Sequence, residues 1–182
     1  MSLKKRELLL VDGYNIIGAW PHLRKLRDID FDQARNDLIE AMAEYQAATG
    51  RMVTVVFDAH MRYGRESIQK RSRVEVVYTK ENETADEWIE RRAHELVDDR
   101  LVTLFVATND FTEQWVIFGQ GALRVPATEL LKDWKQAKVA IEQERQTLAS
   151  DRSNRKTIDI PPDVMARFEE MRRRKSKGED SH

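Results

Sequence analysis

Short apolar runs alternate with amphipathic stretches along this chain, a pattern typical of an α/β domain. Residues 7–11 and Met52–Phe57 are almost continuously apolar, as are strands covered on both faces. Three further strands are predicted at Val74–Tyr78, 101–107 and 122–125. Because predicted strands and helices alternate, we expect a three-layer α/β/α fold with a central, mostly parallel sheet.

The intervening helices are predicted from apolar residues spaced three and four apart. Phe31–Thr49 has this spacing throughout. Thr84 and Glu87 form a capping-box pattern, which predicts that the next helix begins there. A short aromatic helix is expected at 111–118 and a longer one from Pro126 to about residue 150.

Charge and composition divide the chain into two parts. Residues 1–150 carry 22 basic and 25 acidic residues and are predicted to form the domain. Residues 151–182 are predicted to be a linker and a basic C-terminal helix or tail, and 151–177 carry nine basic and five acidic residues. The helix expected at 161–175 would turn four apolar residues inward: Val164, Met165, Phe168 and Met171.

Composition excludes several kinds of chemistry. Hydrophobic residues make up 41% of the chain, which is enough for a sizeable core, and there is no cysteine. Disulfides, thiolate nucleophiles, zinc–thiolate sites and iron–sulfur clusters are therefore excluded. No apolar run approaches the length of a membrane span, and we expect a cytoplasmic protein without a membrane partner.

Acidic residues gather where the predicted strands end. Three follow strands directly or within a few residues, and three lie between the third strand and the next helix: Asp12, Asp58, Asp110, Glu81, Glu83 and Asp86. In an open parallel sheet, ligands bind at the carboxyl ends of the strands. Carboxylates that converge there repel one another, and Mg²⁺ prefers oxygen ligands. Such an ion can activate water for displacement at a phosphodiester.

Each acid also has a purely structural interpretation. Asp86 suits the first turn of a helix, Asp110 can cap the next helix, and Asp12 before Gly13 can form a turn. Taken together at one edge of a sheet, the acids favour a metal site.

Four segments resemble the YacP-like NYN domain family, the nuclease branch related to PIN domains. They are LLVDGYNIIGAWP at 9–21, VVFDAH at 55–60, VVYTKENETADEWIE at 76–90 and VATNDFTEQWVIFGQGALR at 106–124. The resemblance spans about residues 7–175. It implies a PIN-like fold and a metal-dependent endoribonuclease that uses Mg²⁺ or Mn²⁺ and cuts mRNA on the ribosome.

The resemblance also implies site residues. Asp12, Asp86 and Asp110 would be catalytic acids that bind the metal, with Glu83 as an outer acid. Asn15 would orient the scissile phosphate or a water. The role of Asp58 stays open.

RNA-binding residues are expected beside this acidic edge. Tyr14 is a candidate for stacking on a base, although it can equally be packed in the core. Basic residues between the second and third strands are candidates for phosphate contacts: Arg62, Arg65, Lys70 and Arg71.

Two other functions compete with the nuclease. One is a non-catalytic RNA- or ribosome-binding module with a vestigial acidic pocket. The other is a phosphatase of the haloacid-dehalogenase kind, which needs an aspartate two residues after the first, where this chain has Tyr14. We expect the nuclease to act as a monomer.

Overall fold

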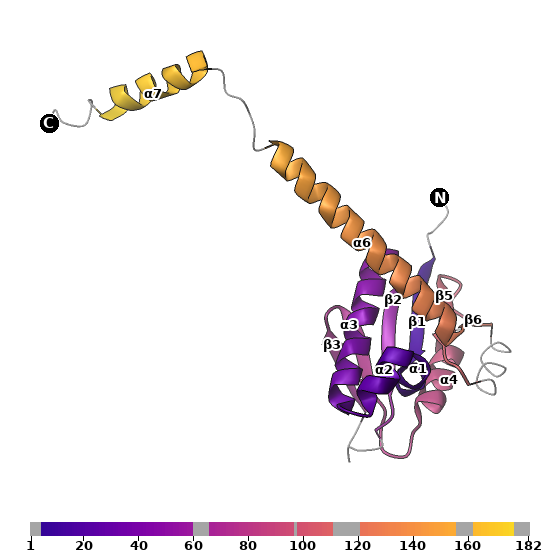
Figure 1. Cartoon of the computed structure of the whole chain (residues 1–182). Coiled ribbons are helices and arrows are strands. Elements are labelled where there is room, and N and C mark those ends of the chain that lie inside the picture. Colours follow the sequence, from indigo (N-terminus) through magenta and orange to yellow (C-terminus); the bar gives the residue numbers. More distant parts are fainter. Residues whose placement is uncertain (1–4, 60–65, 97, 111–120, 156–161, 177–182) are drawn as a thin grey trace. The chain divides into compact units, whose positions relative to one another are not determined.

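The computed structural model describes residues 5–59, 66–96, 98–110, 121–155 and 162–176. Its centre is a sheet with the order β3-β4-β2-β1-β5-β6 (Figure 1). The strands are β1 (Arg6–Asp12), β2 (Met52–Phe57), β3 (Ser67–Arg71), β4 (Val74–Tyr78), β5 (Val102–Ala107) and β6 (Leu123–Val125). All neighbouring pairs are parallel except β3 with β4. The predicted mostly parallel sheet is confirmed.

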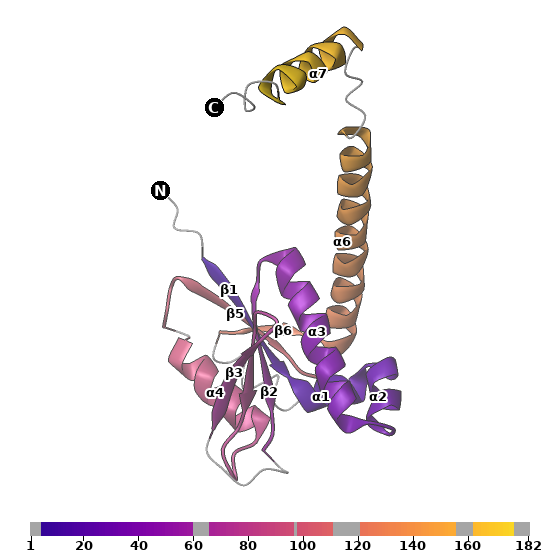
Figure 2. The same cartoon turned by 90° about the vertical axis from the view of Figure 1, so that its left-hand side faces the viewer.

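Helices cover both faces of the sheet because alternate strand residues point to opposite sides. Leu9 and Val11 of β1 pack in a core with α1 (Gly13–Ala19), α2 (Pro21–Arg27) and α3 (Phe31–Thr49). Leu10 lies in a second core beneath α4 (Ala85–Leu96). Figure 2 shows α4 on one side of the sheet and α1 to α3 on the other, which confirms the three layers.

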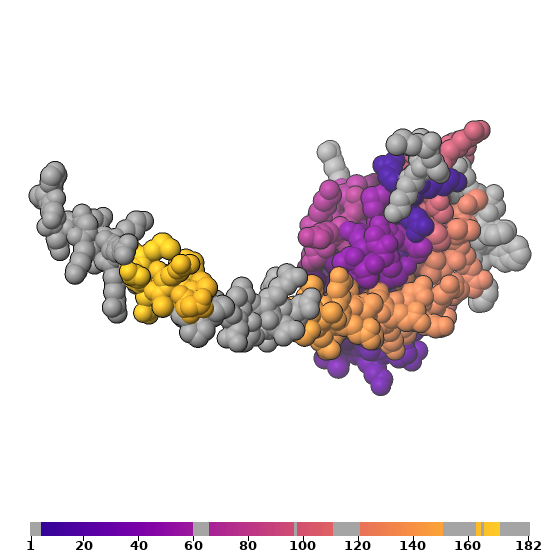
Figure 3. Space-filling view, turned by 90° about the horizontal axis from the view of Figure 1, so that it is seen from above, coloured from indigo at the N-terminus to yellow at the C-terminus, as the bar shows by residue number. Residues whose placement is uncertain are grey.

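The first part of α6 (Ala127–Arg155) packs on the α1–α3 side through tryptophans. The indole of Trp20 donates to the carbonyl of Ala127 at 2.9 Å, and Trp134 donates to Glu44 of α3 at 2.9 Å. The two indole rings lie 5.3 Å apart. In Figure 3 this part of α6 lies along the purple helices of the same side.

One strand was absent from the sequence prediction. Residues 59–72 were expected to be a basic loop, but Ser67–Arg71 pairs with β4 as an antiparallel edge strand. The hairpin turn has positive φ at Ser72 and Arg73, 50° and 75°. The Ser72 hydroxyl donates to Glu40 at 2.8 Å, and Gln46 donates to the Arg73 carbonyl at 2.9 Å, so side chains of α3 stabilise the turn.

The chain divides into two compact units, Met1–Glu142 and Gln143–His182. The helix predicted to end near residue 150 continues to Arg155, and the predicted C-terminal helix is observed as α7 (Pro162–Ser176). Within their own unit Phe168 and Met171 are 61% and 62% exposed, so their inward placement against the domain stays a prediction. The helix predicted at 111–118 lies outside the described residues. Among the described helices, none is long and apolar enough to cross a bilayer.

Candidate active site

The order of the strands places the candidate site at the carboxyl end of β1. From β1 the chain moves to β2 and β4 on one side and to β5 on the other, so strand order reverses here. Such a reversal leaves a crevice at the strand ends where ligands bind. Asp12 is the last residue of β1 and is only 7% exposed.

The turn after β1 fixes the carboxyl of Asp12. Its Oδ1 accepts the backbone N–H of Asn15 at 3.1 Å and caps α1. A Cβ on Gly13 would lie 2.3 Å from the ring of Phe57, which is fully buried. Glycine is therefore required for the turn to lie directly on the core.

One contact brings the start of α4 to the same point, and a second stabilises the first turn of this helix. The backbone N–H of Ala85 donates to the carboxylate of Asp58, the residue after β2. The predicted capping box is also formed, with the Glu87 N–H donating to Thr84 at 3.1 Å and the Thr84 N–H to Glu87 at 2.9 Å. Asp58 therefore anchors the start of α4, which carries Asp86.

The carboxyl of Asp86 lies close enough to that of Asp12 to affect its ionisation. The pKa of Asp12 is raised to about 7, first by burial and then by the negative charges of Asp86 and Asp58, against a lowering by the Asn15 N–H. At pH 7 the Asp12 carboxyl is thus protonated about half of the time. A bound divalent cation would favour its ionised form.

Asn15 connects this turn to the segment after β5. Its side-chain oxygen accepts the backbone N–H of Asn109 at 2.7 Å. The adjacent N–H of Asp110 donates to Thr108 at 3.1 Å. Asn15 thus holds in place the segment that carries Asp110, a positioning role in addition to the contact with phosphate or water that was expected of it.

Glu83 is buried in the connection between β4 and α4. One of its carboxylate oxygens accepts from Arg91 at 3.2 and 3.0 Å, while the buried Oε2 has no hydrogen-bond partner among the residues that the structure describes. Arg91 also contacts Glu66 at 3.4 Å. Neither Arg91 nor Glu66 was predicted from sequence, because such contacts come from folding and not from spacing.

The donor set fits a magnesium-like ion. Among the described residues, no group of three acidic or histidine side chains is arranged to hold a metal. However, Mg²⁺ is commonly bound by one or two carboxylates together with water and substrate phosphate. The buried Asp12 and the half-buried Asp86 could offer two such carboxylate ligands, and a cation would offset their repulsion.

The structure places one of the predicted RNA-binding residues beside the site and two of them away from it. Tyr14 lies beside the site, and its hydroxyl accepts from Arg35 at 3.2 Å. Lys70 and Arg71 are exposed on β3, but Arg71 pairs with Val74 at the amino end of β4. The structure therefore does not bring these two basic residues to the acidic edge. Arg62 and Arg65 lie outside the described residues.

An α/β/α domain with paired acids at the reversal of strand order is the architecture of the PIN-like nuclease superfamily. The model of the YacP-like NYN domain matches residues 9–173, and this chain belongs to that family. It is 50% identical over 167 residues to the uncharacterized protein YacP of Bacillus subtilis, covering 92% of this chain and 97% of that protein.

Two crystal structures agree with the fold described above. Rae1 (YacP) from Bacillus subtilis is 50% identical, with a TM-score of 0.70, and the match covers 91% of this chain and 94% of that one. A mutant of the same Bacillus subtilis protein is 51% identical, with a TM-score of 0.68 and coverage of 79% and 84%.

Proposed function

We propose that this protein is a metal-dependent endoribonuclease whose substrate is mRNA on the ribosome. The single observation that supports it most is the pairing of the buried Asp12 carboxyl with the half-buried Asp86 at the carboxyl end of β1 in a nuclease-type fold. Burying the Asp12 carboxylate beside a second acid is costly in a purely structural role, since an apolar side chain in its place would avoid the repulsion.

In this proposal each side chain at the edge has a distinct task. Asp12 and Asp86 hold Mg²⁺ or Mn²⁺, with Asp110 as a further acid at the end of β5. The ion supplies charge stabilisation and activates water for attack on the phosphodiester. Asn15 keeps the turn after β1 and the segment after β5 at a fixed separation, because it is bonded to both. Glu83 is an outer acid, and its carboxylate accepts a hydrogen bond from Arg91.

The test compares mapped 5′ ends of mRNA on translating ribosomes. The wild-type protein should produce discrete cuts, and Asp12→Asn combined with Asp86→Asn should abolish them. Asp98→Asn, a substitution of an exposed aspartate away from the site, is the matched control and should cut as the wild type does. Binding of Mn²⁺ to the isolated protein, measured by electron paramagnetic resonance, should be lost in the double variant only.

The second candidate is an RNA- or ribosome-binding module. It predicts that the double variant sediments with ribosomes and leaves every 5′ end unchanged relative to the wild type. The exposed basic residues Lys70 and Arg71, distant from the acids, are the observation that favours it.

A further inference from the structure

A continuous row of aromatic rings leads from the sheet to the surface. Tyr78 of β4 lies 5.7 Å from Phe57 of β2, and Phe57 lies 5.0 Å from Tyr14. The ring of Tyr14 is in turn 5.2 Å from Phe31, the first residue of α3. These centroid distances are those of favourable aromatic pairs.

The outer end of this row is open to solvent. Phe31 is 41% exposed, and Ile29 in the connection before α3 is 85% exposed. The inner rings are held by the core, since Phe57 is fully buried. A partly exposed aromatic side chain is thus presented on a rigid support, and exposed aromatic side chains are the groups on which proteins stack nucleobases.

Arg35 fixes the position of this ring face. Its guanidinium lies 5.4 Å from the centroid of Phe31, donates to the Tyr14 hydroxyl at 3.2 Å and pairs with Asp32. The Arg35 side chain is only 17% exposed. Arg35 therefore holds the rings of Tyr14 and Phe31 in place, and its own charge is paired with that of Asp32.

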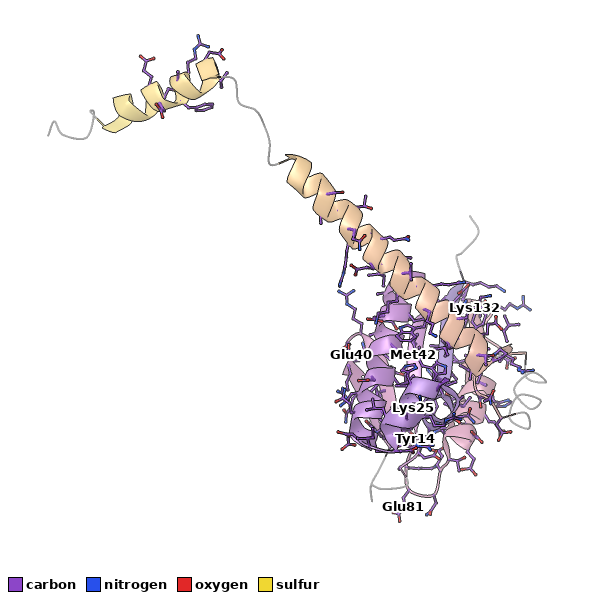
Figure 4. All side chains as sticks on the ribbon, in the orientation of Figure 1. Tyr14, Lys25, Glu40, Met42, Glu81 and Lys132 are labelled. Atoms are coloured by element: carbon purple, nitrogen blue, oxygen red, sulfur yellow. The ribbon has the colours of Figure 1, made fainter. Side chains whose placement is uncertain are left out.

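The row borders the acidic edge. Tyr14 comes two residues after Asp12 in the turn that lies on Phe57. Figure 4 shows Tyr14 at the same end of the domain as Glu81, which is the end where the parallel strands finish. A nucleic acid whose phosphate is bound through a metal ion at Asp12 and Asp86 would therefore bring a neighbouring base to this surface.

We propose that Phe31 stacks an unpaired base of the RNA next to the phosphate held at the acidic edge. The proposal rests on the proposed function for the identity of that phosphate. Arg35 is a positioning residue for the ring. Because every base has an aromatic face, the site tolerates any sequence and requires a single-stranded segment.

The first experiment is photocrosslinking of the full chain with single-stranded RNA that carries 5-iodouridine, which couples to aromatic rings stacked on it. The RNA is presented both free and in stalled ribosome complexes. The wild-type protein is used, so that the acids that hold the phosphate are present, and peptide mass spectrometry locates the adduct. We expect it on Phe31 and not on Phe168, an aromatic side chain that is 61% exposed in α7.

The second experiment measures RNA affinity by fluorescence anisotropy. Phe31→Ala should weaken binding roughly 5- to 100-fold, the usual value of one stacked base, and Phe31→Trp should restore it. Met52→Ala is the matched control, since Met52 is 44% exposed at the amino end of β2. An RNA paired with its complement should bind equally to wild type and Phe31→Ala.

The outcomes separate this proposal from the proposed function. If the wild type cuts RNA, but the adduct lies elsewhere or is absent and Phe31→Ala binds as the wild type does, the stacking site is wrong and the nuclease stands. If the adduct forms on Phe31 and Phe31→Ala weakens binding while no variant cuts RNA, the stacking site stands and the nuclease is wrong.

Discussion

Asp12→Asn should make the metal-free protein more stable at pH 8. Burial raises the pKa of the Asp12 carboxyl from 3.8 to about 7 in the folded protein, so between these values the folded chain binds more protons than the unfolded chain. The free energy of unfolding therefore falls as pH rises through this window, and it levels off above pH 7. At ~1.4 kcal/mol per pH unit, the full cost of ionising the buried Asp12 carboxyl is about 4 kcal/mol.

Asparagine removes this cost and retains the essential contact, because its side-chain oxygen can still accept the Asn15 N–H. The advantage of Asp12→Asn over the wild type should grow by about 3 kcal/mol between pH 5 and pH 8. The assay is urea unfolding in EDTA, followed by the fluorescence of the tryptophans, of which Trp20 is fully buried. Mg²⁺ should reduce the advantage at pH 8 by stabilising the wild type alone.

Asp98→Asn, which changes an exposed carboxylate, is the control. Its free energy of unfolding should equal that of the wild type at each pH. The reasoning is refuted if the unfolding free energies of wild type and Asp12→Asn run parallel from pH 5 to pH 8. If Mg²⁺ raises the free energy of unfolding equally in both proteins, the assignment of the ion to Asp12 is refuted.

Three further substitutions test the supports of the site by urea unfolding. Gly13→Ala should destabilise the protein by about 1 to 3 kcal/mol, because the new Cβ would overlap the buried ring of Phe57; an unchanged midpoint would contradict this contact. Thr84→Ala should cost ~1 kcal/mol through loss of the capping box, and Thr84→Ser should recover most of it. Arg91→Gln should cost roughly 1 to 3 kcal/mol because the buried Glu83 carboxylate loses its cation, and adding Glu83→Gln should recover part of that loss. If the two changes are simply additive, Glu83 and Arg91 are not coupled.

The edge that carries the acids could be located from sequence because it depends on local patterns. The apolar runs of β1, β2 and β5 identify the strands, and the carboxyl ends of parallel strands necessarily meet at one edge. The capping box at Thr84 likewise depends on residues three apart and was predicted correctly.

Sequence was less informative where a residue's contact lies far along the chain. Asp58 binds the N–H of Ala85, 27 residues away, so its role as the anchor of α4 followed only from the fold. The same holds for Arg35, whose cluster joins α1 to α3. The spacing of apolar residues along the chain gives no information about such long-range contacts.

The strand β3 was missed for a different reason. Its sequence is polar because four of its five residues are exposed, and the turn that follows lacks the glycine or asparagine usual at positive φ. Ser72 adopts this conformation with the help of Glu40, which a sequence pattern does not show. In α7, helical spacing correctly predicted a helix, but spacing alone does not say whether anything covers the apolar side chains.

The polar character of β3 has a consequence for solubility. It covers the open edge of β4, whose sequence VEVVY is rich in β-branched residues, and it presents charged side chains at the outer edge instead. At the other end of the sheet, β6 is only three residues long. Long, flat, apolar edges recruit strands from other molecules, and short or charged ones resist it. Removal of β3 would leave β4 as such an edge, so this hairpin keeps separate copies of the chain from aggregating through their sheets.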